Sequence, residues 1–336
     1  MVASYGSIGE RTCDPSLVVP VAVPGAPGTL VGMPPDPIAE RLAHGGTLVL
    51  DGGLATELER RGKDLHDPLW SARVLVEDPD AIREVHASYF EAGADVAISS
   101  SYQATFEGFA GRGLDRDEAA ALMRTSVALA RDAAPDGALV AASIGPYGAM
   151  LGNGAEYTGE YDREEDELVE FHAPRMEVLA EAEPDLFAVE TIPSIVEARA
   201  LVRALERFPE MPAWVSFSCR DGAHICDGTP FQEAIEVATA APSVVAVGVN
   251  CTSPMHVEAL VEIAAATTDR PVVCYPNRGS FWDPVRRTWT DPPRQDARPL
   301  LRPVEWRRAG ARLIGGCCGT TPEDIATIAT SLAATG

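Results

Sequence analysis

Short runs of apolar residues alternate with longer amphipathic stretches along most of the chain, from about residue 38 to the C-terminus. The apolar runs lie at residues 47–51, 95–101, 139–144, 186–191, 213–218, 244–250, 271–276 and 311–316. They are continuously apolar and do not alternate with polar positions, which is typical of parallel strands buried on both faces. The pattern therefore predicts eight strands of a buried parallel sheet.

The stretches between these runs carry the signals of helix starts and stops. Helices are predicted from Asp78-Pro79-Asp80 to Glu91, over 115–132, 194–208 and 229–240, and from Thr321-Pro322 onward. Eight strand–helix units are typical of a (β/α)8 barrel. A doubly wound open sheet shares the alternation, and the count of eight favours the barrel. The predicted fold class is therefore α/β, a (β/α)8 TIM-type barrel.

The first 38 residues show neither strand nor helix periodicity. They are rich in Pro, Gly, Ser and Val, and prolines recur up to Pro37. A segment of this composition buries too little apolar surface to fold by itself. We therefore predict a flexible N-terminal extension over 1–38 and a single barrel domain over 39–336, with Met33 as an alternative start of the biological chain.

The charge balance narrows the classes of function. The 336 residues contain 27 Lys and Arg against 50 Asp and Glu, which gives a net charge of −23. A nucleic-acid-binding protein typically presents a basic face, and none is expected here. Lys63 is the one lysine of the chain, so a phosphate-binding G-K-[ST] motif is excluded and a Schiff-base mechanism has a single candidate. The acidic balance is compatible with cationic small-molecule substrates.

The sequence also bears on the compartment. No apolar run approaches the roughly 20 residues of a membrane-spanning helix, and the N-terminus lacks the basic start of a signal peptide. We therefore expect a cytoplasmic protein with reduced thiols and no membrane partner. The sequence leaves the oligomeric state open.

Polar, glycine and cysteine residues collect where the predicted strands end. The active site of a (β/α)8 barrel lies at the C-terminal ends of its strands. The chemistry-bearing residues at these positions are Asp51, Gln103, Glu190, Asn250, Cys251, Asn277, Cys317 and Cys318. We therefore expect the functional site among these side chains.

Three of the seven cysteines share that predicted rim. Thiolates are ligands that zinc prefers, and three protein ligands leave the open fourth position of a catalytic zinc site. Cys317 and Cys318 are adjacent, so both reach one metal only if the backbone turns there, and Gly315, Gly316 and Gly319 allow this. The alternative is that a cysteine is a small buried hydrophobe, which we favour for Cys219, Cys226 and Cys274.

Longer motifs resemble a known family over nearly every predicted strand. They are DGGLATELERRG (51–62), LWSARVLVEDPDAIREVHASYFEAGAD (69–95), SYQAT with GFAGRGL (101–114), GPYGA (145–149), ET-P (190–193), GVNC (248–251), YPN-G (275–279) and GARLIGGCCGTTP (310–322). Together they strongly resemble the homocysteine S-methyltransferase family, and they look closest to the bacterial and plant type that uses S-methylmethionine. The resemblance runs from about residue 45 to the C-terminus and implies a (β/α)8 barrel.

The resemblance also implies a site and a reaction. By the family pattern Zn²⁺ is held by Cys251, Cys317 and Cys318, while Asp51 and Glu190 contact the amino-acid part of homocysteine. The implied reaction is attack of the zinc-bound homocysteine thiolate on the methyl group of a sulfonium donor, which yields methionine. Asn250, Gln103 and Asn277 are weaker candidates for substrate contacts.

Several alternatives stay open at this point. The same barrel and zinc site is compatible with S-adenosylmethionine or a betaine as donor, or with selenocysteine as acceptor. A non-catalytic zinc or redox protein, with a disulfide between Cys317 and Cys318, is a further alternative that does not need Asp51 and Glu190. The acidic stretch from Glu156 to Glu170 is interpreted as a solvated helix face rather than a site.

Overall fold

The computed structural model describes residues 36–43, 46–65, 70–279, 281–283, 288–290 and 301–335. Eight parallel strands in this part of the chain form one sheet in the order β1-β10-β7-β6-β5-β4-β3-β2. The strands are β1 (Leu48–Val49), β2 (Val96–Ile98), β3 (Leu139–Ile144), β4 (Leu186–Ile192), β5 (Ala213–Phe217), β6 (Val244–Asn250), β7 (Val272–Tyr275) and β10 (Ala311–Ile314). A parallel bridge between Leu50 and Val96 joins the two outer strands and closes the barrel.

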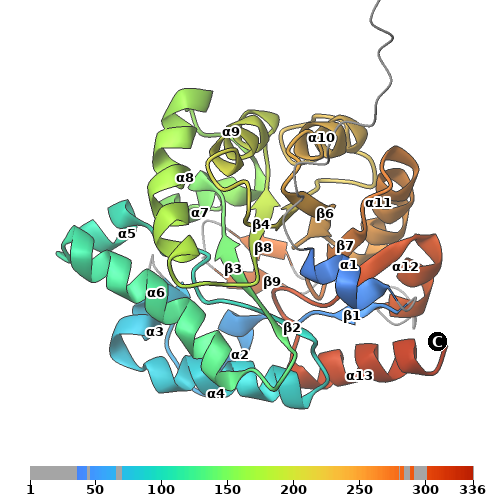
Figure 1. Cartoon of the computed structure of the whole chain (residues 1–336), viewed down its shortest axis with the longest axis horizontal. Helices are drawn as coiled ribbons and strands as arrows, with labels where there is room; N and C mark the ends of the chain where they lie inside the picture. The colour runs from blue at the N-terminus through green and yellow to red at the C-terminus, as the bar shows by residue number, and fades with distance from the viewer. Residues whose placement is uncertain are drawn as a thin grey trace, which may run out of the picture. The chain divides into compact units, whose positions relative to one another are not determined.

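Helices cover the outer side of the sheet, and a few short ones lie at the ends of the barrel (Figure 1). They are α2 (Leu54–Arg60), α3 (Trp70–Glu77), α4 (Pro79–Glu91), α5 (Phe106–Ala110), α6 (Arg116–Ala133), α7 (Tyr147–Leu151), η1 (Ala155–Tyr157), α8 (Glu165–Ala180), α9 (Ile195–Leu205), α10 (Phe231–Ala238), α11 (Pro254–Thr267), α12 (Pro303–Ala309) and α13 (Pro322–Ala333). The predicted (β/α)8 barrel is therefore confirmed.

The helices begin where the sequence placed their caps. The Asp78 side chain accepts a hydrogen bond from Ala81 N at the start of α4, and Asp115 and Thr321 each form a capping box at α6 and α13. These side chains satisfy backbone N–H groups that have no partner within the helix. Helix α10 starts slightly later than predicted, because Pro230 occupies its N-cap position rather than its first turn.

A short helix precedes the first strand and corrects the boundary of the predicted extension. Asp36 caps α1 (Pro37–Leu42), and the Ile38 side chain is fully buried in the barrel interior. The extension was predicted to reach residue 38, but proline is tolerated in the first turn of a helix, so Pro37 does not prevent α1 from forming. The rest of the predicted extension, residues 1–35, lies outside the described residues.

Two layers of apolar side chains hold the barrel together. One fills the barrel interior and includes Leu50, Val96, Trp214 and Leu313, and the other lies between the strands and the helices. Both faces of most strands are buried, as the continuous apolar runs predicted. No helix in the described part is long and apolar enough to cross a membrane.

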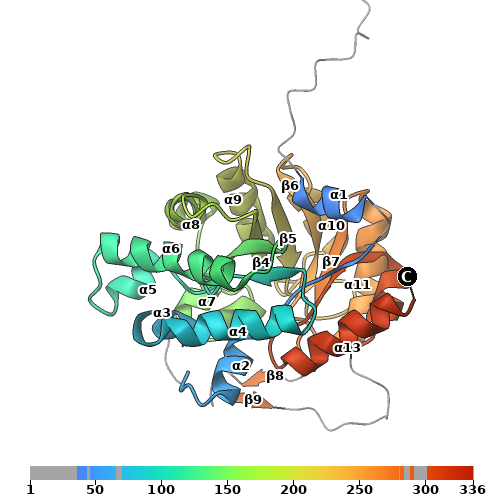
Figure 2. The same cartoon turned by 60° about the horizontal axis from the view of Figure 1, so that its bottom comes forward.

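One element of the structure has no counterpart in the predicted pattern. An antiparallel hairpin of β8 (Phe281–Asp283) and β9 (Thr288–Thr290) follows β7. Figure 2 places this hairpin and α2 at the same end of the barrel, with α1 toward the other end. The hairpin therefore lies on the side where the polar ends of the strands collect.

Candidate metal centre and active site

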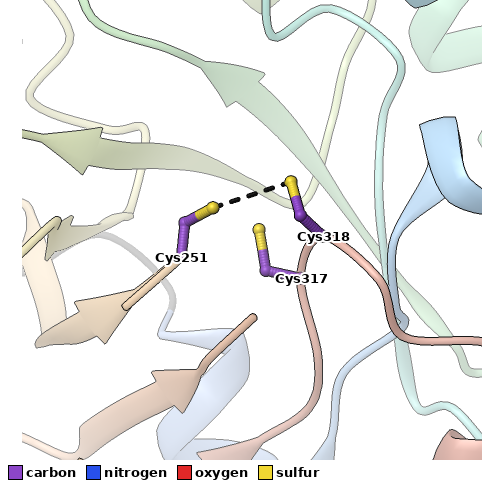
Figure 3. Close-up of side chains that lie close together, drawn as sticks. All are labelled: Cys251, Cys317 and Cys318. Carbon is purple, nitrogen blue, oxygen red and sulfur yellow. Dashed lines mark hydrogen bonds between the residues drawn. The ribbon is translucent and has the colours of Figure 1, made fainter. Parts of the chain in front are cut away.

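Three cysteines from two strand ends converge at the C-terminal mouth of the barrel. Cys251 follows β6, and Cys317 and Cys318 follow β10. Their Sγ atoms all lie within 4.8 Å of one another, and those of Cys251 and Cys318 are 3.6 Å apart. Figure 3 shows the three side chains pointing toward one another. Zn–S bonds of about 2.3 Å in a tetrahedral site require sulfurs about 3.8 Å apart, so the cluster fits such an ion.

The backbone after β10 turns so that two adjacent cysteines both face the cluster. Gly319 has φ of +81°, a conformation that favours glycine. Gly316 allows a close approach, since a Cβ there would lie 2.3 Å from Thr320 Oγ1. That hydroxyl donates to Cys317 O over 2.6 Å and fixes the turn. The two glycines thus let the chain make the turn that the cysteine pair requires.

The third cysteine sits in an uncommon backbone conformation. Cys251 has φ of +44°, which non-glycine residues rarely adopt. Its N–H donates to Tyr275 O over 3.1 Å, and Asn277 Nδ2 donates to its carbonyl oxygen over 3.4 Å. Strained residues of this kind persist where the surroundings hold them, and they cluster at functional sites. Asn277 is therefore placed behind Cys251, outside the lining of the cavity described next.

The three thiols strongly influence one another's ionisation. The pKa of Cys251 is lowered well below its usual value, chiefly because Cys317 and Cys318 hydrogen-bond to its sulfur. The pKa values of Cys317 and Cys318 are raised, because each shares its proton with Cys251 and is buried. One thiolate held by two thiols is a donor set that binds a soft cation with release of the remaining protons.

A cavity of about 110 Å³ opens beside the cysteines and is lined by two of the predicted carboxylates. Asp51 is 2% exposed and accepts a hydrogen bond from Ile98 N over 2.9 Å. Burial raises its pKa well above the usual value, and the charge of Glu190 raises it further. Burial likewise raises the pKa of Glu190 to about 7, although Ser143 Oγ donates a hydrogen bond to this carboxyl. Both groups favour a cationic ligand that would compensate their desolvation.

The predicted polar residues divide into those that line the cavity and those that do not. Gln103 lines it, with Nε2 donating to Ala149 O over 2.9 Å. Asn250 is fully buried and outside the lining, where its amide hydrogen-bonds to Thr191 and Ser216. The structure therefore brings together Asp51, Gln103, Glu190, Cys251, Cys317 and Cys318 around one cavity, and it places Asn250 and Asn277 behind it.

Two lining residues come from a segment that the sequence did not single out. Glu156 and Tyr157 belong to η1, and both line the cavity. Tyr157 Oη lies 3.2 Å from Cys251 Sγ. The interpretation of residues 156–170 as a solvated helix face is wrong for Glu156, which is 3% exposed. Gly154, with φ of +87°, makes a turn just before η1, and η1 lies in the barrel mouth. No local hydrophobic pattern in the sequence signals the burial of Glu156.

Comparisons with known proteins agree on one family. The family model for homocysteine S-methyltransferase matches residues 48–332. Homocysteine S-methyltransferase YbgG of Bacillus subtilis is 48% identical, over 84% of this chain and 93% of its own. Homocysteine S-methyltransferase 4 of Zea mays is 46% identical, over 85% and 89%. The metallated form of the Escherichia coli homocysteine methyltransferase MmuM superposes with a TM-score of 0.78 at 44% identity, over 88% of this chain and 100% of that one.

Proposed function

The chain belongs to the homocysteine S-methyltransferase family, and from this premise we propose that it transfers a methyl group from a small sulfonium donor to the sulfur of homocysteine. We further propose that the reaction uses zinc held by Cys251, Cys317 and Cys318. The observation that carries the proposal is the convergence of three sulfurs within 4.8 Å beside one small cavity. The enzyme class follows from the family.

The donor set supports zinc as the metal. Three cysteine thiolates form a soft, charged site that prefers zinc over magnesium or calcium. Three protein ligands converge among the described residues, so a zinc ion held by them would have a coordination position free for the acceptor sulfur. When bound, zinc supplies a Lewis acid that lowers the pKa of the acceptor thiol from its ordinary value near 8.5.

The carboxylates of the cavity support an amino-acid acceptor. Asp51 and Glu190 are buried acids at the ends of β1 and β4, two strands that β2 and β3 separate around the barrel. The charge of Glu190 still acts on Asp51. We propose that they bind the ammonium group of homocysteine through charge-assisted hydrogen bonds. Ser143 and Ile98 orient them, because Ser143 Oγ donates to Glu190 and Ile98 N donates to Asp51.

The chain then acts mainly by positioning. The clamped ammonium group fixes the acceptor sulfur beside the three cysteines. A lone pair of that sulfur forms the new S–CH3 bond, while the donor C–S bond breaks and its electron pair stays on the donor sulfur. The thiol proton passes to solvent when the acceptor binds. Both products are thioethers without charge on sulfur, and no protein base is needed for the transfer itself.

Charge and size both favour a small cationic donor. None of the described residues that line the cavity is Lys, Arg or His, whereas three are carboxylates. The volume of about 110 Å³ is well below the 300–1,000 Å³ typical of drug-sized ligand sites. S-methylmethionine fits these limits better than S-adenosylmethionine, whose adenosyl group needs room outside the cavity. We further propose that the enzyme works in the cytoplasm, where its cysteines stay reduced for metal binding.

A donor panel tests the proposal. Zinc-loaded enzyme is incubated with homocysteine and, in turn, S-methylmethionine, S-adenosylmethionine and glycine betaine, and methionine is quantified. A parallel series replaces homocysteine by selenocysteine. We expect the highest kcat/KM for S-methylmethionine with homocysteine. Preference for betaine or S-adenosylmethionine would overturn the donor assignment, and absence of methionine with every donor would overturn the proposed function.

A further inference from the structure

Glu156 is a third buried carboxylate in the active-site cavity and has no role in the mechanism above. It belongs to η1, between β3 and α8, while Asp51 and Glu190 come from β1 and β4. Its side chain lines the same cavity as the three cysteines and is 3% exposed. Glu156 therefore approaches the metal centre from a different wall than the two carboxylates assigned to the acceptor.

One oxygen of this carboxylate has no partner in the described part of the chain. Glu156 Oε2 is buried and accepts no hydrogen bond there. Burial raises the pKa of Glu156 to about 7, and the negative charge of Cys251 raises it further. A buried carboxylate oxygen without a partner is costly, and a bound cation would remove that cost. The described residues that line the cavity offer no such cation, so it has to come with a ligand.

The position of Glu156 is fixed by its backbone. Ser218 Oγ donates to Glu156 O over 2.9 Å. On the other side Gly148 packs so closely that a Cβ there would lie 2.6 Å from Glu156 N. The next residue, Tyr157, reaches Cys251 Sγ with its hydroxyl. A segment held at these points presents the Glu156 side chain at a constant place beside the metal centre.

Two aromatic rings accompany the carboxylate. Tyr102 and Tyr157 line the cavity with Glu156. Burial raises the pKa of both phenols, and the charge of Glu156 raises it further. A carboxylate and aromatic rings that line one cavity form a combination that binds onium cations, since the faces of the rings attract positive charge. We call Tyr102, Glu156 and Tyr157 the onium corner.

We propose that Glu156 binds the positively charged group of the methyl donor and thereby makes the enzyme select cationic donors over neutral ones. This inference rests on the proposed function, because it needs a cationic methyl donor at this site. It separates the roles of the acidic residues: Asp51 and Glu190 hold the acceptor, and Glu156 holds the donor. The methyl carbon then lies between the onium corner and the cysteine cluster.

The Glu156→Gln variant tests this assignment, because it keeps the shape of the side chain and removes its charge. Steady-state rates are measured with S-methylmethionine varied at saturating homocysteine, and then with the two substrates exchanged. We expect the KM for the donor to rise about 10–100-fold, as for loss of a charge-assisted contact. The KM for homocysteine, the zinc content and the thermal midpoint should stay close to wild type. Glu156→Asp retains the charge, so its KM for the donor should rise less than that of Glu156→Gln.

Glu160→Gln is the matched control, since Glu160 lies four residues further along the same segment and is exposed. It should leave both KM values unchanged. A calorimetric titration of S-methylmethionine into zinc-loaded protein without homocysteine gives a readout independent of turnover. The assignment is overturned if Glu156→Gln binds the donor as wild type does, or if its KM for homocysteine rises instead. If the wild-type enzyme methylates homocysteine with none of the donors, the proposed function is wrong. The titration distinguishes this outcome from a failure of the Glu156 assignment alone, because it measures donor binding without turnover.

Discussion

The side-chain amide of Asn250 engages both the backbone and the hydroxyl of Thr191. Asn250 Oδ1 accepts a hydrogen bond from Thr191 N over 2.7 Å, and Nδ2 donates to Thr191 Oγ1 over 2.7 Å. Thr191 has φ of +62° and lies where the register between β4 and β5 shifts. Because Thr191 directly follows Glu190, this pair of bonds fixes the strand end that carries the predicted acceptor contact.

The first prediction follows from that pair. Asn250→Ala leaves the buried Thr191 N–H without a partner and should destabilise the fold by about 1–3 kcal/mol. It should also raise the KM for homocysteine, because Glu190 is no longer held in place. Thermal denaturation and steady-state kinetics measure the two effects. Asn250→Asp keeps the acceptor oxygen and should fall between wild type and Asn250→Ala. A wild-type thermal midpoint together with a wild-type KM in Asn250→Ala would refute this role of Asn250.

The second prediction concerns the metal ligands. Cys251→Ser should bind far less zinc and lose methyl transfer, since a hydroxyl is a much poorer zinc ligand than a thiolate. Circular dichroism should still show a folded barrel, because Cys251 lies at the rim and not among the strand contacts. Metal analysis after purification in reductant gives the zinc content per chain.

Cys226→Ser is the matched control for this experiment. Cys226 is also a free cysteine, and its Sγ donates a hydrogen bond to Ser218 Oγ. It does not belong to the three-sulfur cluster. It should retain zinc and turnover. Equal zinc loss in the two variants would show that the cluster is not the metal site.

The third prediction concerns pH and acceptor binding. Burial raises the pKa of Glu190 to about 7, so the group is mostly neutral at pH 6 and mostly ionised at pH 8. Only the ionised carboxylate attracts the homocysteine ammonium group strongly. The ratio of the KM for homocysteine in Glu190→Gln to that in wild type should therefore grow from near one at pH 6 to about tenfold at pH 8. A ratio that does not change between pH 6 and pH 8 would argue against an acceptor contact at Glu190.

The fourth prediction concerns stability at low pH. His86 on α4 is fully buried, its ring nitrogens have no partner in the described part of the chain, and burial lowers its pKa to about 4. Since the ordinary value is about 6.5, the unfolded chain binds a proton more readily, and stability is lost as the pH falls from about 6.5 to 4. Protonation of this one group lowers the free energy of unfolding by at most about 3 kcal/mol.

The His86→Leu variant has no imidazole at this position, so it lacks the loss of stability that protonation of His86 causes at low pH. The gap in thermal midpoint between the variant and wild type should widen in favour of His86→Leu as the pH is lowered from 7 to 5. Parallel curves for the two proteins over this range would show that His86 is protonated without penalty in the folded state.

Much of the barrel could be predicted from sequence, because most strands are buried on both faces and so form apolar runs. Strands β3 and β6 have the predicted bounds, whereas β2 ends at Ile98, three residues before the predicted end. Serines follow Ile98 there, and Ser99 and Ser100 line the cavity, although Ser99 N still donates to Ala141 O of β3. The β8–β9 hairpin was missed because its strands of three residues each are too short for a periodic pattern.

The site divides in the same way. The Cys317–Cys318 pair is flanked by glycines at a strand end, which is a local signal. That Cys251 joins the pair follows from its place at another predicted strand end and from the family resemblance. Asn250 could be placed at the rim, but its partner Thr191 lies 59 residues away, so its hydrogen bonds were not foreseeable. The sequence places Glu156 in an acidic stretch typical of a solvated helix face, whereas its burial depends on close approaches of Gly148 and Ser218 to its backbone, which no local pattern reveals.

A zinc titration of the reduced wild-type enzyme tests the role of the cluster most directly. Chelator-treated protein is supplied with increasing zinc, and methionine formation from homocysteine and S-methylmethionine is measured at each step. We expect negligible turnover without zinc and a linear rise that ends at one zinc per chain, because the sulfurs of Cys251, Cys317 and Cys318 converge on a single candidate metal site. Full turnover in the chelated enzyme, or a rise that continues well beyond one equivalent, would contradict the assignment.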